Sequence, residues 1–302
     1  MSWIALSLVA PLFWTWNAIM DQVVVRGFFK DKSEAALFIG SLGSPFLMVG
    51  FAALYPSVFN VTTTIALSYI ALGAYLTLCF YPYFKAVEKT EASILVAMFQ
   101  LTPVLVFFLG WLFLGETVSL ESLIGSLLVV LGSVFITFDF KTNRLDRRAL
   151  WFMSLSVIML SLYYVLTRAA TIEHDWKAIA FWMAVGSFLL GLGVIGSVKT
   201  YRDIFLSTLQ KGNRSYLVIC LSQEVVYYTG IIISVAAISK TTSVGLAKSV
   251  MSIEPVYAFI AASICGLFFP QIFERLEKKR FFAWKMGCIA FSIFGIYLIY
   301  AN

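Results

Sequence analysis

Charge is scarce in this sequence. Only 13% of its 302 residues are Asp, Glu, Lys or Arg, whereas 61% are hydrophobic. A soluble domain usually contains about 25% charged and 45–50% apolar residues. A soluble fold of this length cannot bury so many apolar side chains. The composition therefore excludes an ordinary soluble domain and indicates that lipid surrounds much of the chain.

Histidine and cysteine are scarce as well. The single histidine, His174, lies in a polar loop, and the four cysteines fall inside apolar runs, where a thiol is an ordinary small buried side chain. We therefore expect no disulfide, no metal site and no cofactor. The motifs G-x-x-x-x-G-K-[ST], H-E-x-x-H and G-x-S-x-G are missing, so we expect neither an ATP-hydrolysing pump nor an enzyme. The basic residues behind the net charge of +6 lie in short loops, which argues against nucleic acid as a partner.

Long apolar runs, in contrast, are abundant. Runs of roughly 18–25 apolar residues can cross a bilayer as helices. We predict ten such spans, and hence an all-α polytopic membrane protein with ten transmembrane helices. The spans cover about residues 3–25, 35–56, 65–84, 92–114, 122–139, 149–170, 178–198, 215–238, 243–268 and 283–301. The first run lacks the basic start and the cleavage site of a signal peptide, so we keep it as the first helix.

The basic residues are distributed unevenly between the two ends of these spans. The loops 1–2, 3–4, 5–6, 7–8 and 9–10 hold 18 Lys and Arg residues, whereas the side that carries both termini holds 3. Cytoplasmic loops are enriched in Lys and Arg. We therefore predict that these five loops are cytoplasmic and that both termini lie outside. The expected location is a bacterial inner membrane.

Two segments of the chain resemble each other. Residues 86–104 read AVEKTEASILVAMFQLTPV, and residues 237–256 read AISKTTSVGLAKSVMSIEPV. Each has an alanine, a Lys-Thr pair, a small-residue start to the next helix and then Pro-Val, so that Pro103 corresponds to Pro255. A match at about half the chain length indicates an internal repeat.

The repeat predicts how the chain is organised. Residues 1–146 would form the first five-helix unit, and residues 147–302 the second. Because five is an odd number of crossings, the second unit must enter the membrane upside down relative to the first. Inverted repeats of this kind are typical of secondary transporters, whose substrate site lies near the midplane between the two units.

The sequence resembles the drug/metabolite transporter superfamily, and within it the ten-helix EamA-like type. The residues that carry the resemblance are Pro103, the FLGE run at 113–116, Gly125, Gly132, Pro255, the FER run at 273–275, Gly287 and Gly295. There are two departures. Glu274 follows Pro255 by 19 residues, whereas Glu116 follows Pro103 by 13. The relatives usually keep both termini in the cytoplasm, opposite to the orientation that the loop charges predict here.

The resemblance implies a central cavity lined by helices 1–4 and 6–9, with helices 5 and 10 at the periphery. It also implies small polar metabolites, amino acids or amphipathic compounds as substrates, and no prosthetic group. The partners that we expect are a small-molecule substrate, membrane lipid and protons. For the protein itself we expect a monomer or a weak homodimer.

Among the charged residues inside the predicted spans, five are candidate functional groups: Asp21, Arg168, Glu224, Lys248 and Glu254. Asp21 and Arg168 are about one turn from helix ends, where a side chain can reach the solvated rim. Glu224 and Glu254 are near the middle of their helices and at similar depth, with Lys248 nearer the outer mouth. A charge inside a membrane is costly and marks a functional site by default.

These charges allow several interpretations. Glu224 and Glu254 are candidates for proton coupling or for attracting a cationic group, and Lys248 would complete a site for a zwitterion. Lys248 and Glu254 are six residues apart, so they do not meet directly on one helix. The alternative for Glu254 is a neutral, hydrogen-bonded residue that steadies the helix at Pro255.

Prolines and polar or aromatic side chains complete the predicted site. Pro103 and Pro255 each remove one backbone hydrogen bond, so they are candidate gating positions, with ordinary packing as the alternative. Aromatic rings can hold an ammonium group by cation–π contact. Besides Lys248, the candidate substrate-binding residues are Trp14, Asn17, Gln100, Tyr164, Tyr228 and Ser252.

We therefore predict a secondary active transporter for an amino-acid-like, zwitterionic or cationic metabolite. It would be coupled to protons and would work by alternating access. One alternative is a gradient-independent exchanger, in which Lys248 binds an anionic or nucleoside-type substrate. Another is a membrane scaffold that does not transport, which the buried charges disfavour.

Overall fold

The computed structural model describes residues 1–302 except 28, 30–31, 88–94, 96–97, 138–146, 211, 269–278 and 302. The described chain is helical and contains no strand. The helices of the first half are α1 (Trp3–Gly27), α2 (Ser33–Gly40), α3 (Ser44–Leu54), α4 (Thr63–Val87), α6 (Thr102–Leu114) and α7 (Leu120–Thr137). Those of the second half are α8 (Arg147–Glu173), α9 (Trp176–Ser197), α10 (Lys199–Thr208), α11 (Arg214–Ile238), α12 (Val244–Met251), α13 (Glu254–Phe268) and α14 (Lys279–Tyr300). Two short 3₁₀ turns, η1 (Ser41–Gly43) and η2 (Pro56–Phe59), complete the list.

Six helical stretches among the described residues are long and apolar enough to cross a membrane. They are Ser33–Leu54, Thr63–Ala86, Arg147–Glu173, Trp176–Ser197, Arg214–Ile238 and Val244–Ala261. Three shorter apolar helices cover Thr102–Leu114, Leu120–Ile136 and Trp284–Tyr300. An all-helical membrane protein is thus confirmed, while the count of ten crossings stays a prediction.

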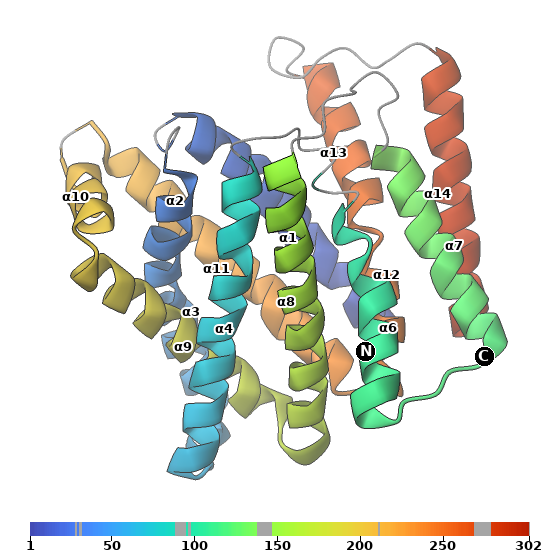
Figure 1. Cartoon of the computed structure of the whole chain (residues 1–302), viewed down its shortest axis with the longest axis horizontal. Helices are drawn as coiled ribbons and strands as arrows, with labels where there is room; N and C mark the ends of the chain where they lie inside the picture. The colour runs from blue at the N-terminus through green and yellow to red at the C-terminus, as the bar shows by residue number, and fades with distance from the viewer. Residues whose placement is uncertain are drawn as a thin grey trace.

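The helices pack in a regular pattern of pairs. α1 packs on α11, and α4 packs on both α8 and α9. α11 also packs on the α2–η1–α3 segment, and α6 packs on α8 and α12. α7 and α14 form a pair of their own, which stands side by side at one edge of the bundle (Figure 1).

Two glycines explain how closely α7 and α14 approach each other. A Cβ atom on Gly125 would lie 2.6 Å from the carbonyl oxygen of Gly295, and one on Gly295 would lie 2.5 Å from the carbonyl oxygen of Gly125. Real Cβ atoms do not come so close to a backbone oxygen, so only glycine fits at either position. Small residues at such crossings let two membrane helices touch through their backbones.

Several helices are interrupted, and prolines follow the interruptions. α6 begins at Thr102 with Pro103 in its first turn. α12 ends at Met251, and α13 begins at Glu254 with Pro255 next to it. Proline lacks the N–H that would continue the helical hydrogen bonds, and its fixed φ suits the start of a helix. The structure thus places a helix break immediately before both of the predicted gating positions.

Candidate functional site

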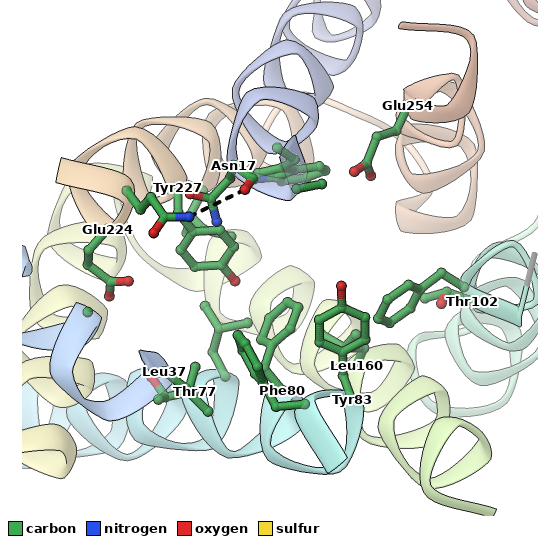
Figure 2. Close-up of a pocket in the computed structure, with 18 of the residues that line it drawn as sticks. Asn17, Leu37, Thr77, Phe80, Tyr83, Thr102, Leu160, Glu224, Tyr227 and Glu254 are labelled. Atoms are coloured by element: carbon green, nitrogen blue, oxygen red, sulfur yellow. Dashed lines mark hydrogen bonds between the residues drawn. The ribbon is translucent and has the colours of Figure 1, made fainter. Parts of the chain in front are cut away.

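A cavity lies inside the helix bundle. Its volume is about 1290 Å³ including its open mouth, and its walls come from α1, α2, α4, α8, α9, α11, α12, the first residue of α13 and the residues that lead into α6 (Figure 2). α7 and α14 contribute none of its described lining residues, which agrees with the peripheral place expected of helices 5 and 10. Binding sites for small molecules are usually apolar concavities with a few placed polar groups, and this cavity has that character.

Most of the predicted site residues meet in this cavity. Six of the seven predicted substrate-binding residues line it together with both of the predicted proton-coupling acids. These eight are Trp14, Asn17, Gln100, Tyr164, Glu224, Lys248, Ser252 and Glu254. Pro103 and Pro255 are not among the lining residues, but Thr102 and Glu254, which precede them, are.

Tyr228 is the one predicted substrate-binding residue that the structure places elsewhere. It is fully buried in the core, and its hydroxyl donates a hydrogen bond to the carbonyl oxygen of Met183 at 3.2 Å. Tyr227 lines the cavity in its place. The signal was in the spacing, because Cys220, Glu224, Tyr227 and Ile231 follow the 4-3-4 pattern of one helix face, and Tyr228 falls beside it.

Lys248 forms the positive part of the site. Its ammonium lies 4.8 Å from the ring centroid of Tyr164 and 5.5 Å from that of Trp14. Both distances are within the range of a cation–π contact. Among the described residues, no carboxylate lies within 4.0 Å of this ammonium. Two aromatic rings from α1 and α8 therefore hold the charge of Lys248 at the cavity wall.

The two acids lie at opposite ends of the cavity, with Asn17 and Tyr227 between them (Figure 2). Glu254 is the first residue of α13, directly after the helix break. Glu224 accepts a hydrogen bond at 3.4 Å from the hydroxyl of Ser44, the first residue of α3 after the η1 turn. Each acid thus lies beside a helix break, Glu254 after the end of α12 and Glu224 against the start of α3.

The break before Glu254 is secured by hydroxyl groups from other helices. Ser133 of α7 donates to the carbonyl oxygen of Ser252 at 2.5 Å, and Thr15 of α1 donates to the carbonyl oxygen of Glu254 at 3.4 Å. The hydroxyl of Ser252 donates to the carbonyl oxygen of Lys248 at 3.0 Å. Irregular backbone inside a membrane needs such partners, and it is found where it lines a cavity.

Four polar atoms of lining residues are buried without a hydrogen-bond partner in the described chain. They are the indole nitrogen of Trp14 and the side-chain oxygens of Asn17, Gln100 and Tyr227. Leaving a buried polar atom unpaired costs roughly 1–3 kcal/mol. Four such atoms in one cavity are typical of a site whose polar groups are completed by a bound molecule.

A largely buried ion pair lies between α6, α8, α11 and α12. The guanidinium of Arg168 donates to Glu116 at 2.9 Å and to the carbonyl oxygen of Ile238 at 3.0 Å. The second oxygen of Glu116 accepts from the backbone N–H of Val244 at 2.9 Å, the first residue of α12. The pair therefore joins the loop after α6 to the ends of α8 and α11 and to the start of α12.

Arg168 differs from its expected place at a solvated rim, because its side chain is only 13% exposed and that of Glu116 only 9%. Gly115 makes the contact possible. Its φ of 64° is left-handed, so it ends α6 and turns Glu116 back toward the bundle. The FLGE run carried this signal, but its role was not evident from the sequence. The side chain of Asp21 lies outside the described part of the chain.

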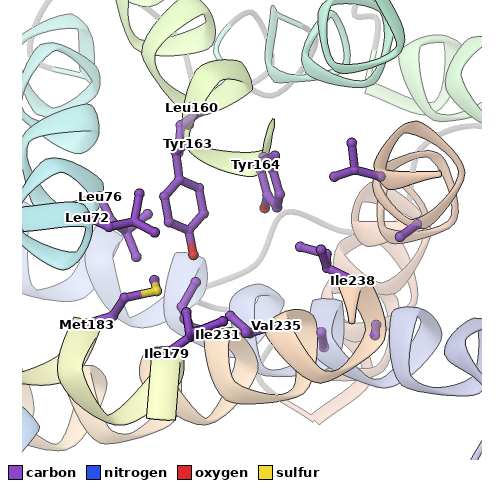
Figure 3. Close-up of a cluster of buried hydrophobic side chains, with 14 of the residues drawn as sticks. Leu72, Leu76, Leu160, Tyr163, Tyr164, Ile179, Met183, Ile231, Val235 and Ile238 are labelled. Atoms are coloured by element: carbon purple, nitrogen blue, oxygen red, sulfur yellow. The ribbon is translucent and has the colours of Figure 1, made fainter. Parts of the chain in front are cut away.

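An apolar core fills the space next to this pair. Tyr163 of α8, Ile179 and Met183 of α9, and Val235 and Ile238 of α11 pack together there (Figure 3). The ends of α6, α8 and α11 that the pair joins lie in the lower part of the bundle in Figure 1, as do both chain ends.

These features define a multi-pass α-helical membrane protein with a charged cavity inside its bundle. The model of the EamA-like transporter family matches residues 1–138. This match confirms the resemblance to the drug/metabolite transporters that was found in the sequence, over residues 1–138. Members of this family are membrane transporters rather than enzymes.

Solved structures support the fold. One of 28 matching chains, described only as "Crystal structure of protein", is 13% identical in sequence, with a TM-score of 0.65. The match covers 98% of this chain and 94% of that chain. At this identity the likeness concerns the fold alone. No curated protein sequence matches the chain.

Proposed function

We propose that the protein is a secondary active transporter for a small zwitterionic or cationic metabolite, coupled to protons. The observation that carries the proposal is the cavity that holds two carboxylates and one ammonium inside a membrane bundle. Such charges are expensive in lipid and are kept where they bind substrates or ions. A scaffold would have no use for them.

The charges favour a cationic or zwitterionic substrate. Glu224 and Glu254 against Lys248 leave one excess negative charge among the described lining residues when all three are ionised. A monovalent cation, or a single proton, would neutralise this excess. A zwitterion adds no net charge, so its passage in a neutral site would require one proton on a carboxylate. This supports coupling of one proton to one zwitterion.

We further propose that residues 1–146 and 147–302 form two inverted five-helix repeats. The helix pairs that pack together support this. When each helix is replaced by its counterpart in the other half, one packed pair becomes another packed pair. The contact of α1 with α11 has its counterpart in that of α8 with α4, and the contact of α4 with α9 in that of α11 with the α2–α3 segment. The pairs α7–α14 and α6–α12 are each their own counterpart.

For alternating access, we propose that the Glu116–Arg168 pair shuts the side of the termini and that this side opens in the transport cycle. The Glu116–Arg168 pair would have to separate, and the breaks before Pro103 and Pro255 would let α6 and α13 tilt. The loop charges assign the shut side, with both termini, to the outside, and the opposite side to the cytoplasm.

Uptake into liposomes tests the proposal. Candidate substrates are first selected by a thermal-shift screen of metabolites on the purified protein. An imposed pH gradient should then drive accumulation of the selected compound above its equilibrium level, and protein-free liposomes are the control. Accumulation that is the same with and without the gradient would reject proton coupling.

Lys248 supports a second candidate function, a gradient-independent exchanger. Its ammonium between Trp14 and Tyr164 offers a place for an anionic group of the substrate. Counterflow without a pH gradient that is lost in Lys248→Ala, together with no effect of the gradient on uptake, would favour the exchanger.

A further inference from the structure

The short helix α10 joins α9 to α11 and differs in character from the helices around it. It has 10 residues and would span about 15 Å, half of the apolar thickness of a bilayer. It also mixes charged and apolar residues in the sequence KTYRDIFLST. It therefore cannot cross a membrane, and it lies at the edge of the bundle (Figure 1).

One face of α10 packs inward. Tyr201, Ile204 and Phe205 contact the cluster around Phe38, whose ring centroid lies 5.3 Å from that of Tyr201. Thr208 is buried on the same face. The spacing 201, 204, 205 and 208 is that of one helix stripe, so this face is fixed to the protein.

The inner face is also anchored by polar contacts. The hydroxyl of Tyr201 donates to Glu34 of α2 at 3.3 Å, and the same carboxylate oxygen accepts from the ammonium of Lys85 at 2.5 Å. Partial burial, with the negative charge of Glu34 adding to it, raises the pKa of the Tyr201 phenol. α10 is thus held in one orientation against the start of α2.

The opposite face is apolar and basic at once. Leu206 is 52% exposed, and Leu209 and Val198 are 42% and 40% exposed. Lys199, Arg202 and, at the start of α11, Arg214 are exposed beside them, with Asp203 as the acid among them. In the described chain, Arg202 and Arg214 contact only backbone carbonyl oxygens.

We propose that α10 lies in the headgroup layer of the cytoplasmic leaflet and binds anionic phospholipid headgroups there. Lys199, Arg202 and Arg214 would meet the phosphates, while Val198, Leu206 and Leu209 enter the acyl boundary. An amphipathic helix of this composition binds in the interface plane, and basic residues near an anionic surface strengthen the binding. The choice of leaflet rests on the orientation in the proposed function, whereas the lipid contact does not depend on transport.

Lipid-specific quenching tests the contact. A bimane is attached at Leu209→Cys in a chain whose native cysteines are alanine, reconstituted in phosphatidylcholine vesicles with 20% phosphatidylglycerol. The quenching label is a doxyl group near the headgroup end of either phosphatidylglycerol or phosphatidylcholine. Labelled phosphatidylglycerol should quench several times more strongly than labelled phosphatidylcholine at equal mole fraction.

Charge variants then test the basic residues. One basic residue near an anionic surface contributes about 1 kcal/mol, so removing it should reduce the preference for phosphatidylglycerol about fivefold at most. The double variant Lys199→Gln with Arg202→Gln should therefore abolish the preference for phosphatidylglycerol. Asp203→Asn should raise it. The matched control is Lys177→Gln with Lys240→Gln, which removes the same charge on the side of the termini and should leave it unchanged.

Two results would overturn the inference. A bimane that is quenched by aqueous iodide and by neither lipid would show that α10 faces water, as it would if it docked a soluble protein. Equal quenching by the two lipids, unchanged in the double variant, would show lipid contact without recognition of the anionic headgroup. Neither result depends on substrate uptake, so both leave the transport proposal to its own test.

Discussion

The Glu116–Arg168 pair should hold the side of the termini shut, and Glu116→Gln is the perturbation that tests this. The substitution keeps the shape of the side chain and leaves an oxygen for the N–H of Val244, but it removes the charge that Arg168 binds. Hydrogen bonds to charged groups contribute roughly 1.5–3 kcal/mol, and the pair is nearly buried, so we expect a loss of about 2 kcal/mol from the closed state. That corresponds to about a 30-fold rise in the ratio of open to closed protein.

The assay is the reaction of a buried cysteine with a membrane-impermeant thiol reagent. Ser234 lies on α11 between Ile231 of the cavity wall and Ile238, which Arg168 contacts, and it is 2% exposed. In reconstituted protein, Ser234→Cys should react about 30-fold faster when Glu116→Gln is present. A cysteine at Ser126, also 2% exposed but on α7, should stay unreactive in both backgrounds, which excludes general unfolding.

A matched control comes from an exposed pair on the same side. Lys177 lies 3.5 Å from Asp175, and such pairs contribute at most about 1 kcal/mol. Lys177→Gln should therefore change the rate at which Ser234→Cys reacts by no more than a few-fold. If Glu116→Gln lowers the thermal stability of the protein but does not change this reaction, the pair is a structural cap of α12 and the reasoning is refuted.

Three further predictions concern the cavity and the packing around it. Tyr227→Phe should weaken substrate binding measured by thermal shift with little loss of stability, whereas Tyr228→Phe should lower the free energy of unfolding by about 1 kcal/mol and leave binding intact. Lys248→Met should weaken the binding of a zwitterion at least tenfold in the same assay and affect a purely cationic ligand less. Gly125→Leu should force α7 away from Gly295 and lower the melting temperature by several degrees, measured by tryptophan fluorescence.

The sequence could predict the membrane class because its composition and long apolar runs depend on local chemistry alone. It could also predict that Trp14, Asn17, Glu224 and Lys248 share a cavity. Charged and polar side chains in membrane helices are costly in lipid, so they face the interior of the bundle. The family resemblance rested on Pro103 and the FLGE run, and the match to residues 1–138 confirms it.

What the sequence could not predict depends on contacts between distant segments. Glu116 and Arg168 are 52 residues apart, and their pairing follows only from the left-handed Gly115 and the packing of α6 on α8. The choice of Tyr227 over Tyr228 differs, because Tyr227 shares a helix face with Glu224 and the spacing alone could have shown it. For Glu116 and Arg168 the residue type was informative, but the partner was fixed by the tertiary structure.

The most direct test of the central claim compares two transport modes in the acid variants. Glu224→Gln and Glu254→Gln remove the groups proposed to take up the proton, and Glu121→Gln, an exposed acid at the start of α7, is the control. We predict that at least one of the two variants loses accumulation driven by a pH gradient while it retains counterflow, and that the control retains both. If both variants accumulate substrate with the pH dependence of the parent protein, the cavity acids do not couple transport to protons.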